Sequence, residues 1–255
     1  MPIPADFADL AADILVRMRT RAPRVHCITN SVAQQYTANV LLAAGAVPSM
    51  TISPDEIAAF VAGADALLVN LGTFDAERRA AIDVAISAAN AGRKPWVLDP
   101  VFVDRAPQRA EFARNLLAHR PAVVRLNTAE LVALSGRDSP GDAPVRLAKT
   151  YATIVALTGT ADHVTDGARR ATIANGDQLM ARVTAMGCAG SALIAAALVV
   201  EPDPFVAASA ALIAFGVAGE VAAVDASGPG SFAAAIIDAL YGLDGATLRR
   251  HAKVS

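Results

Sequence analysis

The chain has 255 residues, of which 54% are hydrophobic and 18% charged, and its formal net charge at pH 7 is -2. This composition is that of a globular protein long enough to bury a full core, and it excludes an intrinsically disordered chain. The small net charge provides no basic field for binding nucleic acid or an anionic membrane surface. Two cysteines, Cys27 and Cys188, are too few for a disulfide framework and indicate a reducing cytoplasm.

Five short apolar runs alternate with helical segments along the first two thirds of the chain. Each run ends in a turn or a polar residue, and the segments between them, such as 75–91 and 108–119, have a helical pattern. Continuous apolar strands separated by helices predict an α/β fold with a largely parallel central sheet and helices on both of its faces. The runs are RVHCIT, ALLVNLG, PWVLDPV, AVVRLN and TIVALTG.

The pattern changes after the last of these runs. Residues 163–183 contain an Asp-Gly and an Asn-Gly pair between short alternating stretches, which predicts a small antiparallel meander. The C-terminal third is expected to be helical. Its two uncharged stretches, 187–200 and 205–219, are shorter than the roughly 18 to 20 residues of a membrane span, so we interpret them as helices buried in the core or at a subunit contact. Because no linker or repeat divides the chain, residues 1–255 are expected to form one domain.

Polar residues at the ends of the apolar runs are candidates for a functional site, because ligands of open α/β sheets bind beyond the carboxyl ends of the strands. Two of them are acids, Asp99 in VLDPV and Glu130 in RLNTAEL, and a pair of carboxylates suits Mg²⁺. The alternative for each acid is structural: Asp99 would cap a turn before Pro100, and Glu130 would lie at a helix start. The remaining strand-end candidates are Asn30, Asn70, Asn127 and Thr158.

Two further features indicate anion binding. Arg125 lies inside an apolar run, where a charge is costly unless a phosphate or a structural salt bridge pairs with it. The stretch TAMGCAGSAL, residues 184–193, precedes an apolar helix whose free N–H groups and dipole would favour an anion. Cys188 in its first turn is expected to have a lowered pKa; the alternative is a cysteine packed as a small hydrophobic residue.

Several motifs together resemble the hydroxyethylthiazole kinases, a thiamin-salvage family of the ribokinase-like superfamily. They are VHCITNSVAQQYTANVLLAAGAVPSM, NLGT, VLDPV, RLNTAEL, LTGTADHVTDG, VTAMGCAGSAL and FGVAGEVAAVDASGPGSF, and they cover nearly the whole chain in the order of the family. The resemblance implies a ribokinase-like fold and Mg²⁺-dependent transfer of the γ-phosphoryl group of ATP to the primary alcohol of 4-methyl-5-(2-hydroxyethyl)thiazole. It also implies a homotrimer with active sites between the subunits.

The resemblance implies roles for single residues as well, and Asn30 and Gly187 are added to them for their places at a strand end and a helix start. The assignments are Cys188 for catalysis, Met50, Ala185 and Asn30 for the substrate, Arg125, Thr158 and Gly187 for ATP, and Asp99 and Glu130 for Mg²⁺.

The chain departs from the family pattern at two places near these residues. A small, glycine-rich loop is usual after LDPV, whereas Phe102–Arg105 follow here, and the usual GTGC reads AMGC at 185–188. These changes leave two alternatives open: a kinase of another small heterocyclic alcohol, or a ligand-binding protein that transfers no phosphate. A lyase acting on hydrated nucleotides is disfavoured by HCITN and GAVPSM.

Overall fold

The computed structural model describes residues 4–136 and 141–255, and its centre is one eight-stranded sheet in the order β2-β1-β3-β4-β5-β6-β7-β8. Strands β1 to β6 are parallel to one another, and β7 and β8 extend the sheet antiparallel. The strands are β1 (Arg24–Ile28), β2 (Val47–Ser49), β3 (Ala66–Asn70), β4 (Trp96–Asp99), β5 (Val123–Asn127), β6 (Ile154–Thr158), β7 (Asp162–Thr165) and β8 (Arg170–Ile173).

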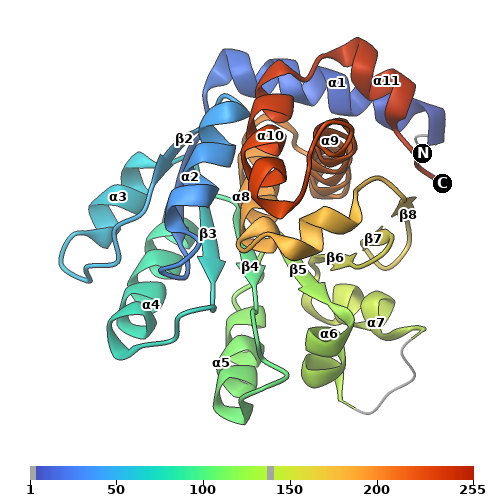
Figure 1. The fold of residues 1–255 in the computed structure, drawn as a ribbon. Coiled ribbons are helices and arrows are strands. Elements are labelled where there is room, and N and C mark those ends of the chain that lie inside the picture. The colour runs from blue at the N-terminus through green and yellow to red at the C-terminus, as the bar shows by residue number, and fades with distance from the viewer. Residues whose placement is uncertain (1–3, 137–140) are drawn as a thin grey trace.

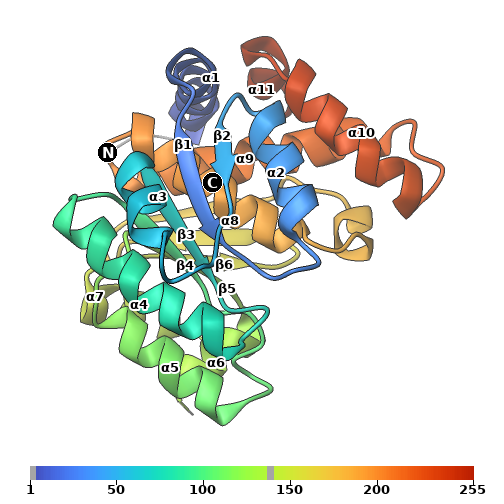
Figure 2. The same ribbon diagram turned by 90° about the vertical axis from the view of Figure 1, so that its left-hand side faces the viewer.

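Helices cover both faces of this sheet, as the sequence predicted (Figure 1). Side chains alternate along each strand between the two apolar clusters, so that Cys27 packs on one face and Ile28 on the other. One face carries α3 (Ile57–Gly63), α4 (Ala76–Ala91), α5 (Pro107–Leu117), α6 (Thr128–Ser135) and α7 (Ala143–Tyr151). The other carries α1 (Pro4–Arg21), α2 (Gln34–Ala43), α8 (Met186–Val200), α9 (Pro204–Ala223), α10 (Pro229–Gly242) and α11 (Gly245–His251), as Figure 2 shows from the side.

All five apolar runs form strands, but the predicted meander is only partly present. The Asp-Gly pair joins β7 to β8, whereas the Asn-Gly pair at 175–176 leads into a short 3₁₀ helix, η1 (Gln178–Arg182). The next strand-like partner of β8 comes from the end of the chain, where Val254 bridges Ile173. Strand β2 was not predicted, because its three residues are too few to show a period.

The two apolar stretches form α8 and α9, which are core helices of this chain. Helix α9 is long and apolar enough to cross a membrane, but 89% of that window is buried inside the protein. The packing of α9 against α1, α8 and α10 accounts for its lack of charge. The apolar character of these helices is therefore no sign of a subunit contact.

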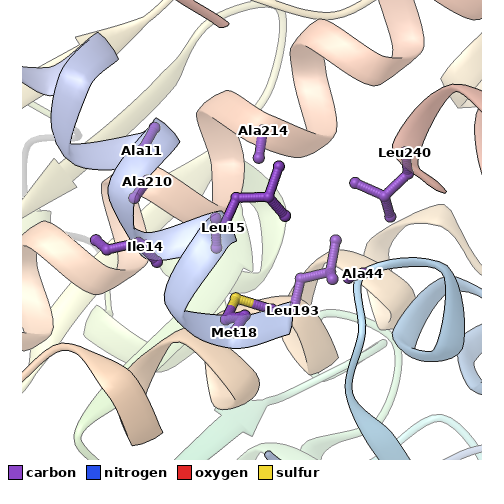
Figure 3. A pocket seen from close by; sticks show the side chains of 10 residues that line it. Ala11, Ile14, Leu15, Met18, Ala44, Leu193, Ala210, Ala214 and Leu240 are labelled. Atoms are coloured by element: carbon purple, nitrogen blue, oxygen red, sulfur yellow. The ribbon is translucent and has the colours of Figure 1, made fainter. Parts of the chain in front are cut away.

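The packing of these helices leaves one small cavity between α1, α2, α8, α9 and α10 (Figure 3). Its volume is about 10 Å³ and its walls are apolar, so it is too small and too dry to hold a ligand. It is a local packing defect lined by Ala11, Ile14, Leu15, Met18, Ala44, Leu193, Ala210, Ala211, Ala214 and Leu240.

Candidate active site

The carboxyl ends of the parallel strands bring the predicted polar residues to one edge of the sheet. Asn70 at the end of β3 lies in register with Asp99 at the end of β4, and Asn127 on β5 with Thr158 on β6. Helix α8 begins at the same edge, and its first turn carries Cys188. The fold thus brings the end of β3 next to Cys188, which is 118 positions away in the chain.

Cys188 accepts hydrogen bonds from two asparagine side chains. The Nδ2 of Asn30 donates to the Cys188 Sγ at 3.1 Å, and the Nδ2 of Asn70 donates to it at 3.3 Å. The two amides also contact each other, because Asn30 Nδ2 lies 3.4 Å from Asn70 Oδ1. The sulfur is therefore held in one orientation by Asn30, which follows β1, and by Asn70 at the end of β3.

Asp99 lies beside this group and is fully buried. Its Oδ2 accepts hydrogen bonds from Asn70 Nδ2 at 2.8 Å and from Ser191 Oγ at 2.9 Å, while its Oδ1 has no partner. The side chain does not cap the turn before Pro100. Burial raises the pKa of Asp99, and the charge of Arg125 opposes that shift. A buried carboxylate with a free oxygen is suited to a cation.

The thiol of Cys188 does not have the lowered pKa that the helix start predicted. Burial raises the pKa to about 11, and the carboxylate of Asp99 adds to the rise. The hydrogen bonds from Asn30 and Asn70 and the charge of Arg125 act in the opposite direction but are outweighed. Cys188 is therefore a thiol at neutral pH in the free protein. Cys27 is fully buried in β1, and burial raises its pKa as well, which agrees with its expected inertness.

Arg125 points at the first turn of α8. A Cβ added to Gly187 would lie 2.5 Å from the Nη1 of Arg125, so the guanidinium occupies the space that a side chain would fill. The Nε of Arg125 is buried without a hydrogen-bond partner, and within the described part of the chain the guanidinium forms no ion pair. Its charge acts at longer range on the pKa values of Asp99, Glu130 and Asp162. A positive group at a helix start with no paired acid is suited to an anion.

Glu130 is buried as well, but it has a structural role that the sequence offered as its alternative. It forms a capping box with Asn127 at the start of α6, in which Asn127 N donates to Oε2 at 2.9 Å. Its Oε1 accepts a hydrogen bond from Phe102 N at 3.1 Å. Burial raises the pKa of Glu130, and Asp99 contributes to that rise. Both carboxylate oxygens are thus engaged, unlike those of Asp99.

The Glu130 contact holds the unusual loop after β4. Phe102 has a left-handed backbone conformation with φ of 61°, and the residue is 55% exposed. Val103 anchors the loop in the core. An aromatic side chain therefore projects at this edge of the sheet.

The remaining candidates lie around the same edge. Met50 follows the edge strand β2 and is half-buried against the apolar cluster that contains Met186. Ala185 is the N-cap of α8 and is left-handed, with φ of 76°. Thr158 ends β6, and its hydroxyl donates to the Leu126 carbonyl at 3.4 Å. The sequence left Asn70 as a strand-end residue without a role, and it gave no sign of Ser191.

Comparisons with known proteins agree with this arrangement. The model of the hydroxyethylthiazole kinase family matches residues 15–245. A probable hydroxyethylthiazole kinase of Agrobacterium fabrum is 46% identical over 246 residues, which cover 96% of this chain and 94% of the relative.

Solved structures show the same relationship. The hydroxyethylthiazole kinase structure from Pyrococcus horikoshii OT3 superimposes with a TM-score of 0.93 at 37% identity, over 97% of this chain and 98% of that one. A ribokinase-like superfamily protein from Enterococcus faecalis has a TM-score of 0.64 at 14% identity, over 87% of this chain and 88% of that one, and shows the fold alone. The fold is therefore ribokinase-like.

Proposed function

The chain belongs to the hydroxyethylthiazole kinase family, and we propose that it phosphorylates the primary alcohol of 4-methyl-5-(2-hydroxyethyl)thiazole with ATP, as a step of thiamin salvage. The observation that carries the proposal is the grouping of Cys188, Asp99 and Arg125 at the start of α8. Phosphoryl transfer depends mainly on positioning the reactants and on stabilising the charge of the transferred group. Cys188 would position the substrate hydroxyl, and Asp99 and Arg125 would stabilise the charge through Mg²⁺ and the phosphates.

The phosphate contacts are assigned to Arg125 and the first turn of α8. The guanidinium lies against Gly187 with an unpartnered Nε. The first N–H groups of a helix have no intrahelical partner, and those of α8 would bind the transferred group. Thr158, at the end of the neighbouring strand β6, completes the ATP side of the site.

The residues of the site fit Mg²⁺, because Asp99 has a buried carboxylate oxygen without a partner. Asp99 would bind the ion directly, and Glu130 would act through water, since its oxygens already accept two backbone hydrogen bonds. Among the described residues no group of three or more potential protein ligands occurs, so the remaining ligands would be water and phosphate oxygens. When bound, Mg²⁺ would neutralise charge on the phosphates.

Cys188 is assigned to the substrate hydroxyl. Asn30 and Asn70 hold the sulfur in place, and a loose transition state requires little deprotonation of the attacking hydroxyl at an early stage. In its thiol form Cys188 orients the alcohol, whereas the hydroxyl proton can be accepted only by the thiolate, which is the minor form at neutral pH because burial raises the pKa to about 11. Met50 and Ala185 are assigned to contacts with the thiazole.

We propose further that the protein is a cytoplasmic homotrimer with active sites between subunits, and that residues 1–255 form one domain in each. Light scattering coupled to gel filtration tests the trimer, and a monomer mass would refute it.

The deciding experiment follows ADP release with Mg²⁺, ATP and the thiazole alcohol in the wild type and in Asp99→Asn. Asparagine can still accept the hydrogen bonds from Asn70 and Ser191, so the variant removes a buried charge and keeps the fold. We expect unfolding stability to stay equal or rise, because burial opposes the charged form, while turnover falls at least about 100-fold.

Two further variants complete the experiment. Cys188→Ala is expected to lose about 10²- to 10⁴-fold in rate if the Cys188 thiolate accepts the proton of the substrate hydroxyl. Asp104 is an exposed residue of the loop that follows β4, where it pairs with Arg105. Asp104→Asn is therefore the control and should keep wild-type turnover. A folded wild type without thiazole-dependent ADP release, or an Asp99→Asn variant as active as the wild type, would refute the proposal.

A further inference from the structure

Three consecutive residues, 29–31, are held by one neighbouring segment, which consists of the connection from β3 to α4 and the first turn of α4. Thr29 O accepts a hydrogen bond from the Nε of Arg78 at 3.2 Å, and Ser31 N donates to the Thr73 Oγ1 at 3.2 Å. Between them, Asn30 packs so closely on Gly72 that a Cβ there would lie 2.7 Å from its Nδ2. Residues 29–31 are thus fixed on both sides of the amide that reaches Cys188.

Arg78 is an unusual residue to find in this place, because it is only 6% exposed. A buried guanidinium is costly unless it is paired and hydrogen-bonded. Arg78 meets that need with an ion pair to Asp75 and the contact to the Thr29 carbonyl. The forked guanidinium can make both contacts at once, whereas the single ammonium of a lysine cannot match that geometry.

The start of helix α4 does not require this side chain. Asp75 caps the helix by accepting a hydrogen bond from the backbone N of Arg78 at 2.8 Å, and any residue at position 78 would offer that N–H except proline. The neighbouring Arg79 is exposed and lies over the Phe74 ring instead. The buried side chain of Arg78 is therefore directed at the segment of Asn30.

We propose that Arg78 and Thr73 are positioning residues that hold residues 29–31 so that the Asn30 amide stays on the sulfur of Cys188. The inference rests on the proposed function for its catalytic meaning, but the contact it describes exists without substrate. Loss of the Arg78 contact to Thr29 or of the Thr73 contact to Ser31 lets the backbone of residues 29–31 shift. A shift of about 1 Å at a reacting group can lower the rate by up to about 100-fold.

The test is a double-mutant cycle between Arg78→Met and Asn30→Ala, with the rate of Cys188 modification by methyl methanethiosulfonate as the first readout. Mass spectrometry separates Cys188 from the fully buried Cys27. We expect Arg78→Met to change the rate by about tenfold in the wild-type background and by less than about twofold when Asn30 is alanine. Arg79→Met is the matched control and should leave the rate unchanged.

The second readout is turnover of the thiazole alcohol in the same four proteins. We expect Arg78→Met to lower kcat by about tenfold with little change in the KM for ATP. The reason is that residues 29–31 contact Cys188 on the substrate side of the proposed site, not on its ATP side. In the Asn30→Ala background the loss should again nearly vanish. If the wild type shows no turnover, the proposed function fails while the thiol readout still decides the positioning role.

A second double-mutant cycle, between Thr73→Val and Asn30→Ala, tests the inference in case Arg78→Met does not fold. Thr73→Val keeps the side-chain volume and removes the hydroxyl that accepts from the Ser31 N–H and lies 3.5 Å from the Ser31 Oγ. Its coupling to Asn30→Ala is measured in the same way. The inference would be overturned if Arg78→Met and Thr73→Val had the same effect with Asn30 present as in the Asn30→Ala background. It would also be overturned if neither substitution changed the rate of Cys188 modification.

Discussion

Gly187 lies in the first turn of α8, directly against the guanidinium of Arg125, and its replacement by alanine should separate stability from ATP use. A Cβ at this position would lie 2.5 Å from Nη1 and 3.1 Å from Cζ of Arg125. Atoms in ordinary contact are about 3.5 to 4.0 Å apart, so the guanidinium has to move by roughly 1 Å. The rest of the site is left as it is, because the clash involves only the end of one flexible side chain.

The expected magnitudes follow from these distances. Alanine in a helix gains up to about 1 kcal/mol over glycine, and a displaced arginine rotamer costs about 0.5 to 1.5 kcal/mol. The two effects nearly cancel, so the free energy of unfolding should change by no more than about 1 kcal/mol. If Arg125 binds the phosphates, a displacement of that size should lower kcat/KM for ATP by about 10- to 100-fold.

The assay combines urea unfolding with ADP-release kinetics at varied ATP. Gly190→Ala is the control in the same helix, since its Cβ would meet Phe215 Cδ1 at an ordinary 3.6 Å. It should gain up to about 1 kcal/mol in stability and keep wild-type kcat/KM. Wild-type kcat/KM for ATP in a folded Gly187→Ala protein would show that Arg125 does not contact the nucleotide.

Two further predictions concern stability. Burial lowers the pKa of His26 below its ordinary value of 6.5, so the folded protein favours the neutral ring, which bonds Ser49 and the Thr51 carbonyl. The stabilisation from the neutral ring is complete above about pH 6.5 and is lost as the pH falls toward the lowered pKa. The free energy of unfolding in urea should therefore fall more steeply between about pH 7.5 and 5 in the wild type than in His26→Gln. Parallel pH curves for the two proteins would contradict this prediction. Ala185→Gly removes a left-handed alanine with φ of 76°. The left-handed conformation costs alanine about 1 to 2 kcal/mol, and glycine relieves that strain at an entropic cost of about 0.5 to 1 kcal/mol. The Tm of Ala185→Gly should therefore rise by a few degrees, and a lower Tm would refute the presence of strain at this residue.

Much of the sheet could be predicted from local pattern. Each apolar run is long enough to show continuous burial, and continuous burial with intervening helices occurs in parallel sheets. Once the strands are parallel, their carboxyl ends must meet at one edge, which is why the sequence alone predicts that Asn30, Asn70 and Asp99 lie at one site. Short elements carried no such signal: β2 has three residues, and the pairing of Val254 with Ile173 joins distant parts of the chain.

The electrostatic state of the site could not be predicted in the same way. The helix start alone indicated a lowered pKa for Cys188, but the pKa depends on everything that packs around the sulfur. Burial and the neighbouring Asp99 raise it to about 11. The free oxygen of Asp99 and the engaged oxygens of Glu130 are likewise properties of their neighbours.

The sequence by itself therefore determined which residues stand at strand ends, because side-chain alternation and helix period act within a few positions of the chain. It also determined the family, through motifs spread over nearly its whole length. Only the tertiary structure decided that Asn30 and Asn70 share one sulfur, that Arg78 braces the segment of Asn30, and that α8 and α9 are covered within one chain. Desolvation, hydrogen bonding and packing depend on atoms that approach from distant segments, and the folded chain alone brings those atoms together.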